Sequence, residues 1–127
     1  MDILLDTHAA MWFFEGNPKM PILAREDICN LENMIYVSIA SLWELAIKLN
    51  TGKLEFDGGL DGFMDAIDKN EFALLEVDPE HIKATMNLPL IHRDPFDRMI
   101  IAQAMVEDMA IMTIDENILK YDIESVW

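Results

Sequence analysis

The chain has 127 residues, of which 52% are apolar, and this length fits one domain with one hydrophobic core. Its formal net charge of −15, from 24 acidic and 9 basic residues, argues against non-specific binding to nucleic acid, because phosphate affinity comes from lysine and arginine. Basic protein partners are favoured instead. The single cysteine, Cys29, excludes a disulfide within the chain, and no apolar run is long enough to span a membrane. The N-terminal stretch lacks the basic region of a signal peptide, so we expect a cytoplasmic protein.

Strands and helices are expected to alternate along the chain. Short apolar or β-branched runs predict strands at residues 2–6, 34–38, 72–78, 110–115 and 124–127. Helical spacing and end signals predict helices at residues 7–18, 21–32, 38–54, 60–70, 79–88 and 95–108, and a helical turn at 117–122. The glycine-rich stretch 56–62 is interpreted as a surface loop.

This alternation predicts an α/β fold in which a parallel sheet is covered by helices on both faces. Ligands of such sheets bind at the carboxyl ends of the strands, where the strand order changes direction. Functional residues are therefore expected directly after strands, or on the first turns of the helices that follow them.

The stretch "HRDPFDRMIIAQA" at residues 92–104 places two aspartates at the start of a long apolar helix. Asp94 is predicted to be the N-cap and Pro95 the first helical residue, where its missing N–H costs nothing. Asp97 then takes the third helical position, where a carboxylate meets the positive end of the helix dipole. Local stability alone can explain both acids, so the rest of the chain has to decide whether either one has a further role.

Four acids lie where the expected fold places ligand sites: Asp6, Glu44, Asp97 and Asp115. Each adjoins an apolar run, where an unpaired carboxylate is unfavourable. Each also has a structural alternative, which for Asp6 and Asp115 is to cap the element that follows.

Glu44 has two structural alternatives of its own. It could complete a capping box with Ser41, or pair with Lys48 one turn later. Ser38 is the more natural N-cap because it directly follows the strand, and this leaves Glu44 in the helix interior, an unusual position for a purely structural acid.

A converging set of four carboxylates needs compensating positive charge. Arg93, Arg98 and Lys48 can supply part of it, and a divalent cation can supply it better. All-oxygen ligands suit Mg²⁺ or Mn²⁺, which promote phosphodiester hydrolysis in many sites of this kind. No spacing of cysteine and histidine indicates zinc, and His81 is expected on the surface of its helix.

Four segments together resemble the PIN-domain proteins of the VapC toxin type: "ILLDTHAAMWF", "SIASLWELAIKLNTGKL", "HRDPFDRMIIAQA" and "MTIDENILKYDIESVW". The resemblance runs almost from end to end, so residues 1–127 are expected to form a single PIN domain. It implies a flavodoxin-like three-layer α/β sandwich with a central, mainly parallel sheet. It also implies an endoribonuclease that depends on Mg²⁺, with Mn²⁺ as a substitute.

The resemblance assigns roles residue by residue. Asp6 and Asp97 match the main metal ligands, while Glu44 and Asp115 match residues that position the metal and the attacking water. Asp94 matches no catalytic position and keeps its role as N-cap. Further positions that border the site in such proteins are Thr113, Thr7, Ser38 and His8. Ile114 replaces a small residue and is interpreted as a variation in the core.

Proteins of this type usually form homodimers, act on RNA, and are held inactive by a small antitoxin with a basic tail. The charge of −15 fits that partner better than it fits RNA. Contacts with RNA are expected from Lys48, Lys53, Arg93 and Arg98, gathered from two chains.

The chain lacks residues that are required by two other enzyme or signalling classes with a similar first strand. A phosphatase of the haloacid-dehalogenase type needs a second acid two residues after Asp6, where this chain has His8. A receiver domain needs an adjacent acidic pair near the N-terminus, which "MDILLDTH" lacks. The remaining alternative is a catalytically idle PIN fold that serves as a binding module for an antitoxin or another basic partner.

Overall fold

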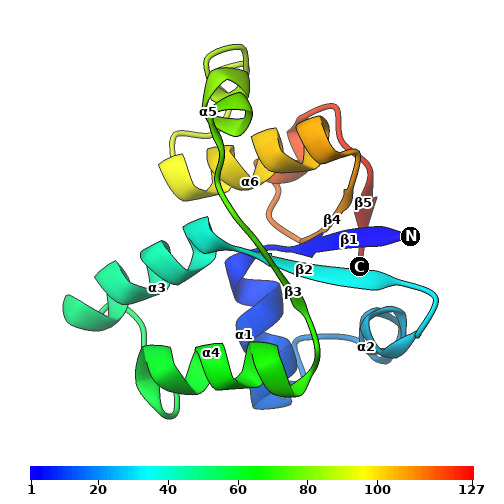
Figure 1. Cartoon of the computed structure of the whole chain (residues 1–127), viewed down its shortest axis with the longest axis vertical. Coiled ribbons are helices and arrows are strands. Elements are labelled where there is room, and N and C mark those ends of the chain that lie inside the picture. Colours follow the sequence, from blue (N-terminus) through cyan, green and yellow to red (C-terminus); the bar gives the residue numbers. More distant parts are fainter.

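A five-stranded, wholly parallel sheet forms the centre of the computed structural model, which describes residues 1–127 (Figure 1). The strands lie in the order β3-β2-β1-β4-β5. Their bounds are β1 Asp2–Leu5, β2 Met34–Ser38, β3 Ala73–Leu75, β4 Ala110–Met112 and β5 Ser125–Val126. All five predicted strands are present, although β3, β4 and β5 are shorter than expected.

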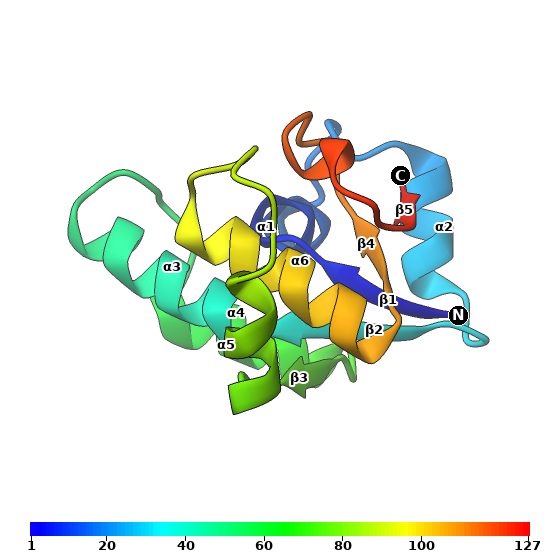
Figure 2. The ribbon, with the colours of Figure 1, turned by 90° about the horizontal axis from the view of Figure 1, so that it is seen from above.

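Helices cover both faces of this sheet, as predicted. Figures 1 and 2 show α1, α2 and α4 on one face and α5 and α6 on the other, with α3 extending beyond the carboxyl end of β2. None of the helices is long and apolar enough to cross a membrane. Their bounds are α1 Thr7–Glu15, α2 Ile22–Cys29, α3 Ile39–Asn50, α4 Gly59–Lys69, α5 Pro79–Thr85, α6 Pro95–Glu107 and the short 3-10 helix η1 Ile118–Lys120.

The central strand β1 divides the core into two clusters. Ile3 and Leu5 point to the side of α1, α2 and α4, whereas Leu4 points to the side of α6 and η1, as the two-residue period of a strand requires. All three side chains are fully buried. Burying each stabilises the fold by about 1.5–3 kcal/mol relative to leaving it exposed. The predicted three-layer α/β arrangement is thereby confirmed.

The glycine-rich stretch is only partly a loop. Gly58 has a φ of 80° and precedes α4, which begins at Gly59 and includes Gly62 in its first turn. A Cβ atom on Gly62 would lie 2.6 Å from the carbonyl oxygen of Asp57, so glycine is needed for this close approach. The prediction of a surface loop over the whole of residues 56–62 was wrong, because α4 already begins at Gly59.

His81 is fully buried, so the prediction that it lies on the surface was wrong. Its Nδ1 accepts the backbone N–H of Asp78 at 3.1 Å, and its Nε2 lies 3.1 Å from Oε1 of Glu107 on α6. These partners satisfy the ring and join α5 to α6. The partner Glu107 lies 26 residues away, beyond the reach of any local pattern.

The direction of the chain changes at β1. From β1 the chain runs outward to β2 and β3, and it then returns through α6 to β4 and β5 on the other side of β1. The carboxyl ends of β1 and β4 therefore flank the switch point, where ligands bind in folds of this class.

Candidate functional site

The four predicted acids meet in one pocket at this switch point. The pocket has a volume of about 350 Å³ and takes side chains from α1, α3, α6 and the segments that follow β1 and β4. Its lining residues are Asp6, Glu44, Asp97, Asp115, Asp94, Lys48, His8, Trp12 and Ile114.

Asp6 and Asp115 reach the pocket from the ends of neighbouring strands, and both also act as caps. Oδ1 of Asp6 accepts the backbone N–H of Ala9 at 2.7 Å. Oδ1 of Asp115 accepts the N–H groups of Asn117 at 2.8 Å and Ile118 at 3.1 Å. The structural alternative for these two acids is therefore true as well, but each cap uses only one carboxylate oxygen.

Glu44 is held in the pocket by two partners and is only 3% exposed. The Thr7 hydroxyl lies 2.6 Å from Oε1, and the ammonium of Lys48 donates to Oε2 at 2.5 Å. The ion pair with Lys48 is thus confirmed. The capping box with Ser41 is not formed, because Ser38 is the N-cap of α3 and accepts the N–H of Ala40 at 3.0 Å.

Asp94 is the N-cap of α6, as predicted. Oδ1 of Asp94 accepts the N–H groups of Phe96 at 2.9 Å and Asp97 at 3.0 Å, and Pro95 is the first helical residue. This cap fixes the first turn, and from that turn the Asp97 side chain extends into the pocket. Its Oδ2 lies 2.8 Å from Nε2 of His92.

Crowding of like charges changes the titration of the pocket. The pKa of Asp97 is raised from 3.8 to about 8, first by burial and then by the charges of Asp94, Glu44, Asp6 and Asp115. Burial also raises the pKa of Asp6, against the opposing effect of a hydrogen bond from Thr113. At neutral pH Asp97 therefore holds a proton that an ordinary aspartate would have lost.

Lys48 is the one lysine or arginine that lines the pocket. Burial lowers its pKa, but its hydrogen bond and ion pair with Glu44 and the charges of Asp94 and Asp97 outweigh this, so the net shift is upward. One ammonium cannot neutralise five carboxylates. The residues present therefore fit a divalent cation, and their hard oxygen donors suit Mg²⁺ or Mn²⁺.

The supporting residues predicted from the sequence have three different positions. Thr7 and Thr113 contact site carboxylates, because Thr7 bonds Glu44 and the Thr113 side chain bonds Asp6. His8 is exposed and lines the pocket. Ser38 is buried behind it, where its hydroxyl donates to Oε1 of Gln103 at 2.5 Å.

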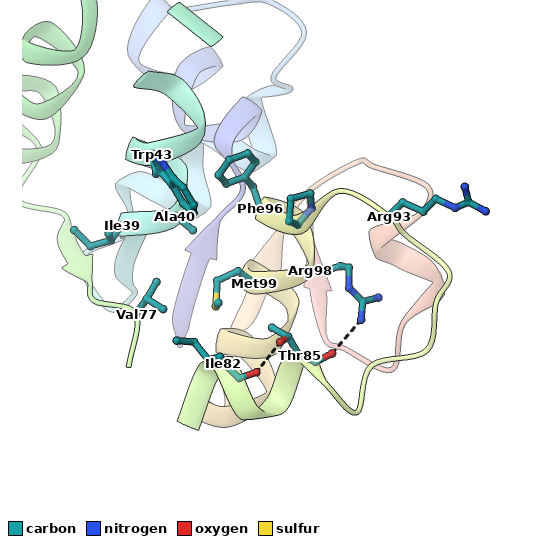
Figure 3. A pocket seen from close by; sticks show the side chains of 11 residues that line it. Ile39, Ala40, Trp43, Val77, Ile82, Thr85, Arg93, Phe96, Arg98 and Met99 are labelled. Atoms are coloured by element: carbon teal, nitrogen blue, oxygen red, sulfur yellow. Dashed lines mark hydrogen bonds between the residues drawn. The ribbon is translucent and has the colours of Figure 1, made fainter. Parts of the chain in front are cut away.

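The two arginines near the pocket differ in their surroundings. Arg98 donates to the backbone carbonyls of Thr85 and Pro89, both at 3.0 Å, and so ties the segment before α6 to the helix (Figure 3). Arg93 is exposed, and its side chain extends away from the neighbouring residues in Figure 3. Arg93 is available to an outside ligand, whereas the guanidinium of Arg98 is occupied within the chain.

An apolar groove of about 550 Å³ lies beside the acidic pocket, between α3, α5 and α6 (Figure 3). Trp43 and Phe96 meet edge to face in it with a centroid distance of 5.3 Å. Their chain neighbours Glu44 and Asp97 line the acidic pocket, so the two hollows adjoin. Trp43 is 65% exposed.

Three residues of the site were missed or misread in the sequence. His92 contacts Asp97 but gave no local signal, because its role depends on residues that the fold brings to it. Trp12 lines the pocket from α1. Ile114 is 46% exposed at the pocket, so its interpretation as a core variation was wrong; it directly follows a buried strand and a buried threonine, which made burial the simpler reading.

The raised pKa of Asp97 predicts how stability depends on pH. Between the ordinary pKa of 3.8 and about 8, the folded protein holds a proton that the unfolded chain has released. The free energy of unfolding of the metal-free protein should therefore fall as pH rises through this range. Asp97→Asn removes the titrating group and should make the slope clearly shallower. Urea denaturation in EDTA at several pH values measures both slopes, and equal slopes would contradict the raised pKa.

Comparison with known proteins identifies the family and similar folds. The family model of the PIN domain matches residues 3–124. A search of curated protein sequences found no significant match. VapBC2 from Rickettsia felis, solved bound to a DNA fragment from its promoter, has 17% identity and a TM-score of 0.74, with coverage of 100% of this chain and 99% of that one.

Two other solved structures are similar. VapBC-1 from nontypeable Haemophilus influenzae has 17% identity and a TM-score of 0.68, covering 99% of this chain and 97% of that one. FitAcB from Neisseria gonorrhoeae has 18% identity and a TM-score of 0.64, covering 98% and 96%. At identities this low, the structural similarity shows a shared fold alone. Because the family match spans nearly the whole sequence, the chain belongs to the PIN domain family.

Proposed function

We propose that this protein is a Mg²⁺-dependent endoribonuclease, formed by residues 1–127 as a single PIN domain. The observation that carries the proposal is the meeting of Asp6, Glu44, Asp97 and Asp115 in one pocket at the switch point of the sheet. Carboxylates in this number repel one another unless protons or a cation lie among them. The same repulsion contributes to the raised pKa of Asp97.

Each acid has a distinct task in the proposed site. Asp6 and Asp97 would hold the cation, and Asp115 and Glu44 would help to position it and a water beside it. When bound, the cation supplies a water activated for attack and stabilises charge on the phosphodiester. The chain itself supplies orientation: Thr7 and Lys48 fix the carboxylate of Glu44.

The acidic character of the chain limits how RNA can bind. Of the basic residues expected to contact RNA, Lys48 lies in the pocket and Arg93 and Lys53 are exposed. We leave Arg98 out of the proposed contacts because its guanidinium is bonded within the chain. A homodimer would offer two such sets of cations to one RNA, and affinity should fall steeply with salt.

We propose further that the protein is the toxin of a toxin–antitoxin pair and acts in the cytoplasm. Two of the similar structures described above are VapBC complexes, and the net charge of −15 favours a basic partner. A tail that places arginine or lysine in the acidic pocket can reach the apolar groove with a neighbouring side chain, since Trp43 and Phe96 of the groove are the chain neighbours of Glu44 and Asp97 of the pocket.

The nuclease proposal is tested by cleavage of total cellular RNA by the purified protein in Mg²⁺, with the ends mapped by sequencing. Asp97→Asn should lower the rate by more than about 100-fold, since even residues outside the ligand shell of metal sites contribute about 10–100-fold. Asp94→Ala should cost about 0.5–2 kcal/mol of stability as a lost N-cap, and should affect cleavage only through the position of α6.

The control is Glu116→Gln, which removes the exposed acid next to Asp115 and should leave cleavage unchanged. A protein that binds Mg²⁺ without cleaving any RNA would contradict the proposed activity. Equal losses of stability and of activity in Asp94→Ala and Asp97→Asn would contradict the division of roles between them.

The partner proposal predicts competition with the metal. A basic side chain in the pocket neutralises the same carboxylates as Mg²⁺, so Mg²⁺ should weaken partner binding and the partner should weaken Mg²⁺ binding by the same factor. Salt should mainly slow association, because long-range attraction steers the encounter. Calorimetry with the cognate partner, with and without saturating Mg²⁺, measures the coupling.

In the same experiment, Trp43→Ala distinguishes the contribution of the apolar groove from that of the acidic pocket. It should weaken partner binding through the groove and leave Mg²⁺ affinity unchanged, because Trp43 does not line the acidic pocket. Partner binding that does not respond to Mg²⁺ would show that inhibition does not use the acidic pocket.

A further inference from the structure

His92 is a half-buried histidine next to the acidic pocket, in contact with Asp97, and its Nε2 atom has no hydrogen-bond partner. Its side chain is 13% exposed, and its Nε2 atom is buried. This atom lies 2.8 Å from Oδ2 of Asp97 and 3.7 Å from Oδ2 of Asp115. The distance to Asp97 is within hydrogen-bond range, although the contact is not formed as a hydrogen bond, and the distance to Asp115 is just beyond that range.

The other ring nitrogen fixes the tautomer. The backbone N–H of Asp94 donates to Nδ1 of His92 at 3.3 Å, so Nδ1 carries no proton. The neutral ring therefore carries its proton on Nε2, between the two carboxylates. A ring nitrogen that bears a proton is a hydrogen-bond donor and cannot be a metal ligand in that state.

We infer that His92 is a positioning residue of the metal site, whose Nε2–H bridges the carboxylates of Asp97 and Asp115 and sets their separation. The inference rests on the proposed function, because it concerns how this chain holds the cation proposed above. Both acceptor oxygens lie within 4 Å of Nε2.

The bridge connects two ligands that are otherwise anchored separately. Asp97 is placed by the cap of α6, and Asp115 by its own hydrogen bonds to the turn that begins η1. No other group forms a hydrogen bond or ion pair with both Asp97 and Asp115. Donors behind metal-binding carboxylates orient these ligands, and their loss typically lowers metal affinity by about 10–100-fold.

His81 provides a contrast within the same chain. Its Nδ1 also accepts a backbone N–H, from Asp78, but its Nε2 is hydrogen-bonded to Glu107, outside the acidic pocket. Both of its nitrogens are satisfied, so its role is to hold α5 against α6. A variant of His81 should therefore lower stability without changing metal affinity.

Two substitutions separate the two sides of the His92 ring. His92→Asn keeps an acceptor near the position of Nδ1 for the Asp94 N–H, but ends short of the carboxylates. His92→Gln extends far enough to offer an amide N–H near the position of Nε2. A purely structural role in the loop predicts that asparagine is the better substitute, whereas a bridging role predicts that glutamine is.

The experiment is a Mn²⁺ titration of the full-length purified chain by calorimetry and electron paramagnetic resonance. Wild type should bind Mn²⁺, and Asp97→Asn should not. His92→Asn should weaken binding by about 10–100-fold, and His92→Gln should restore most of the loss. The bound Mn²⁺ should show no coupling to an imidazole nitrogen, and His81→Gln should lower the melting temperature with unchanged Mn²⁺ affinity.

Each result bears on one of the two proposals. Equal Mn²⁺ affinity in wild type and His92→Asn would overturn the bridging role. A nitrogen coupling that disappears in both His92 variants would overturn it too, because His92 would then be a direct ligand. A wild-type protein that binds no Mn²⁺, or binds it equally well after Asp97→Asn, would overturn the proposed metal site itself. A His92→Asn variant that binds weakly because it is misfolded would be recognised by a lowered metal-free melting temperature, and His92→Gln then decides.

Discussion

Repulsion among carboxylates at the switch point of the sheet is the constraint on which the rest of this site depends. Five acids share a pocket in which Lys48 is the one lysine or arginine. The free energy of this arrangement is lowered by protonation, by hydrogen bonds or by a bound cation. The pKa of Asp97 is raised to about 8, Thr7 and Lys48 hold Glu44, and the donor set suits a hard divalent ion.

The same acids also build the fold, and this double use explains how such a crowded site remains stable. Asp6 and Asp115 each give one oxygen to backbone N–H groups, and Asp94 caps the helix that carries Asp97. A cap fixes the backbone next to a ligand at a gain of about 0.5–2 kcal/mol, which offsets part of the electrostatic repulsion. Structural and functional readings of these residues are therefore complementary.

Local patterns were sufficient to predict the strands, the helices and the four acids. Asp6 and Asp115 follow strands, Asp97 lies in the first turn of α6, and Glu44 is an unusual acid in the interior of α3. Local patterns were not sufficient wherever a partner comes from far along the chain. His81 is satisfied by Glu107, and His92 faces Asp115, so neither role is visible in a window of neighbouring residues. Arg98 was expected to bind substrate, but carbonyls of the segment before α6 occupy it. The acids that meet in the pocket were foreseen; the hydrogen bonds that hold them there were visible only in three dimensions.

The central claim is that Asp6 and Asp97, aided by Glu44 and Asp115, hold a divalent cation in this pocket. Diffraction from crystals soaked in Mn²⁺, measured at a wavelength where manganese scatters anomalously, tests it most directly. The account predicts an anomalous peak within about 2–2.5 Å of carboxylate oxygens of Asp6 and Asp97, the range of metal–oxygen bonds in such sites. A well-ordered pocket with no peak at saturating Mn²⁺, or a peak bound only by residues outside the pocket, would contradict it.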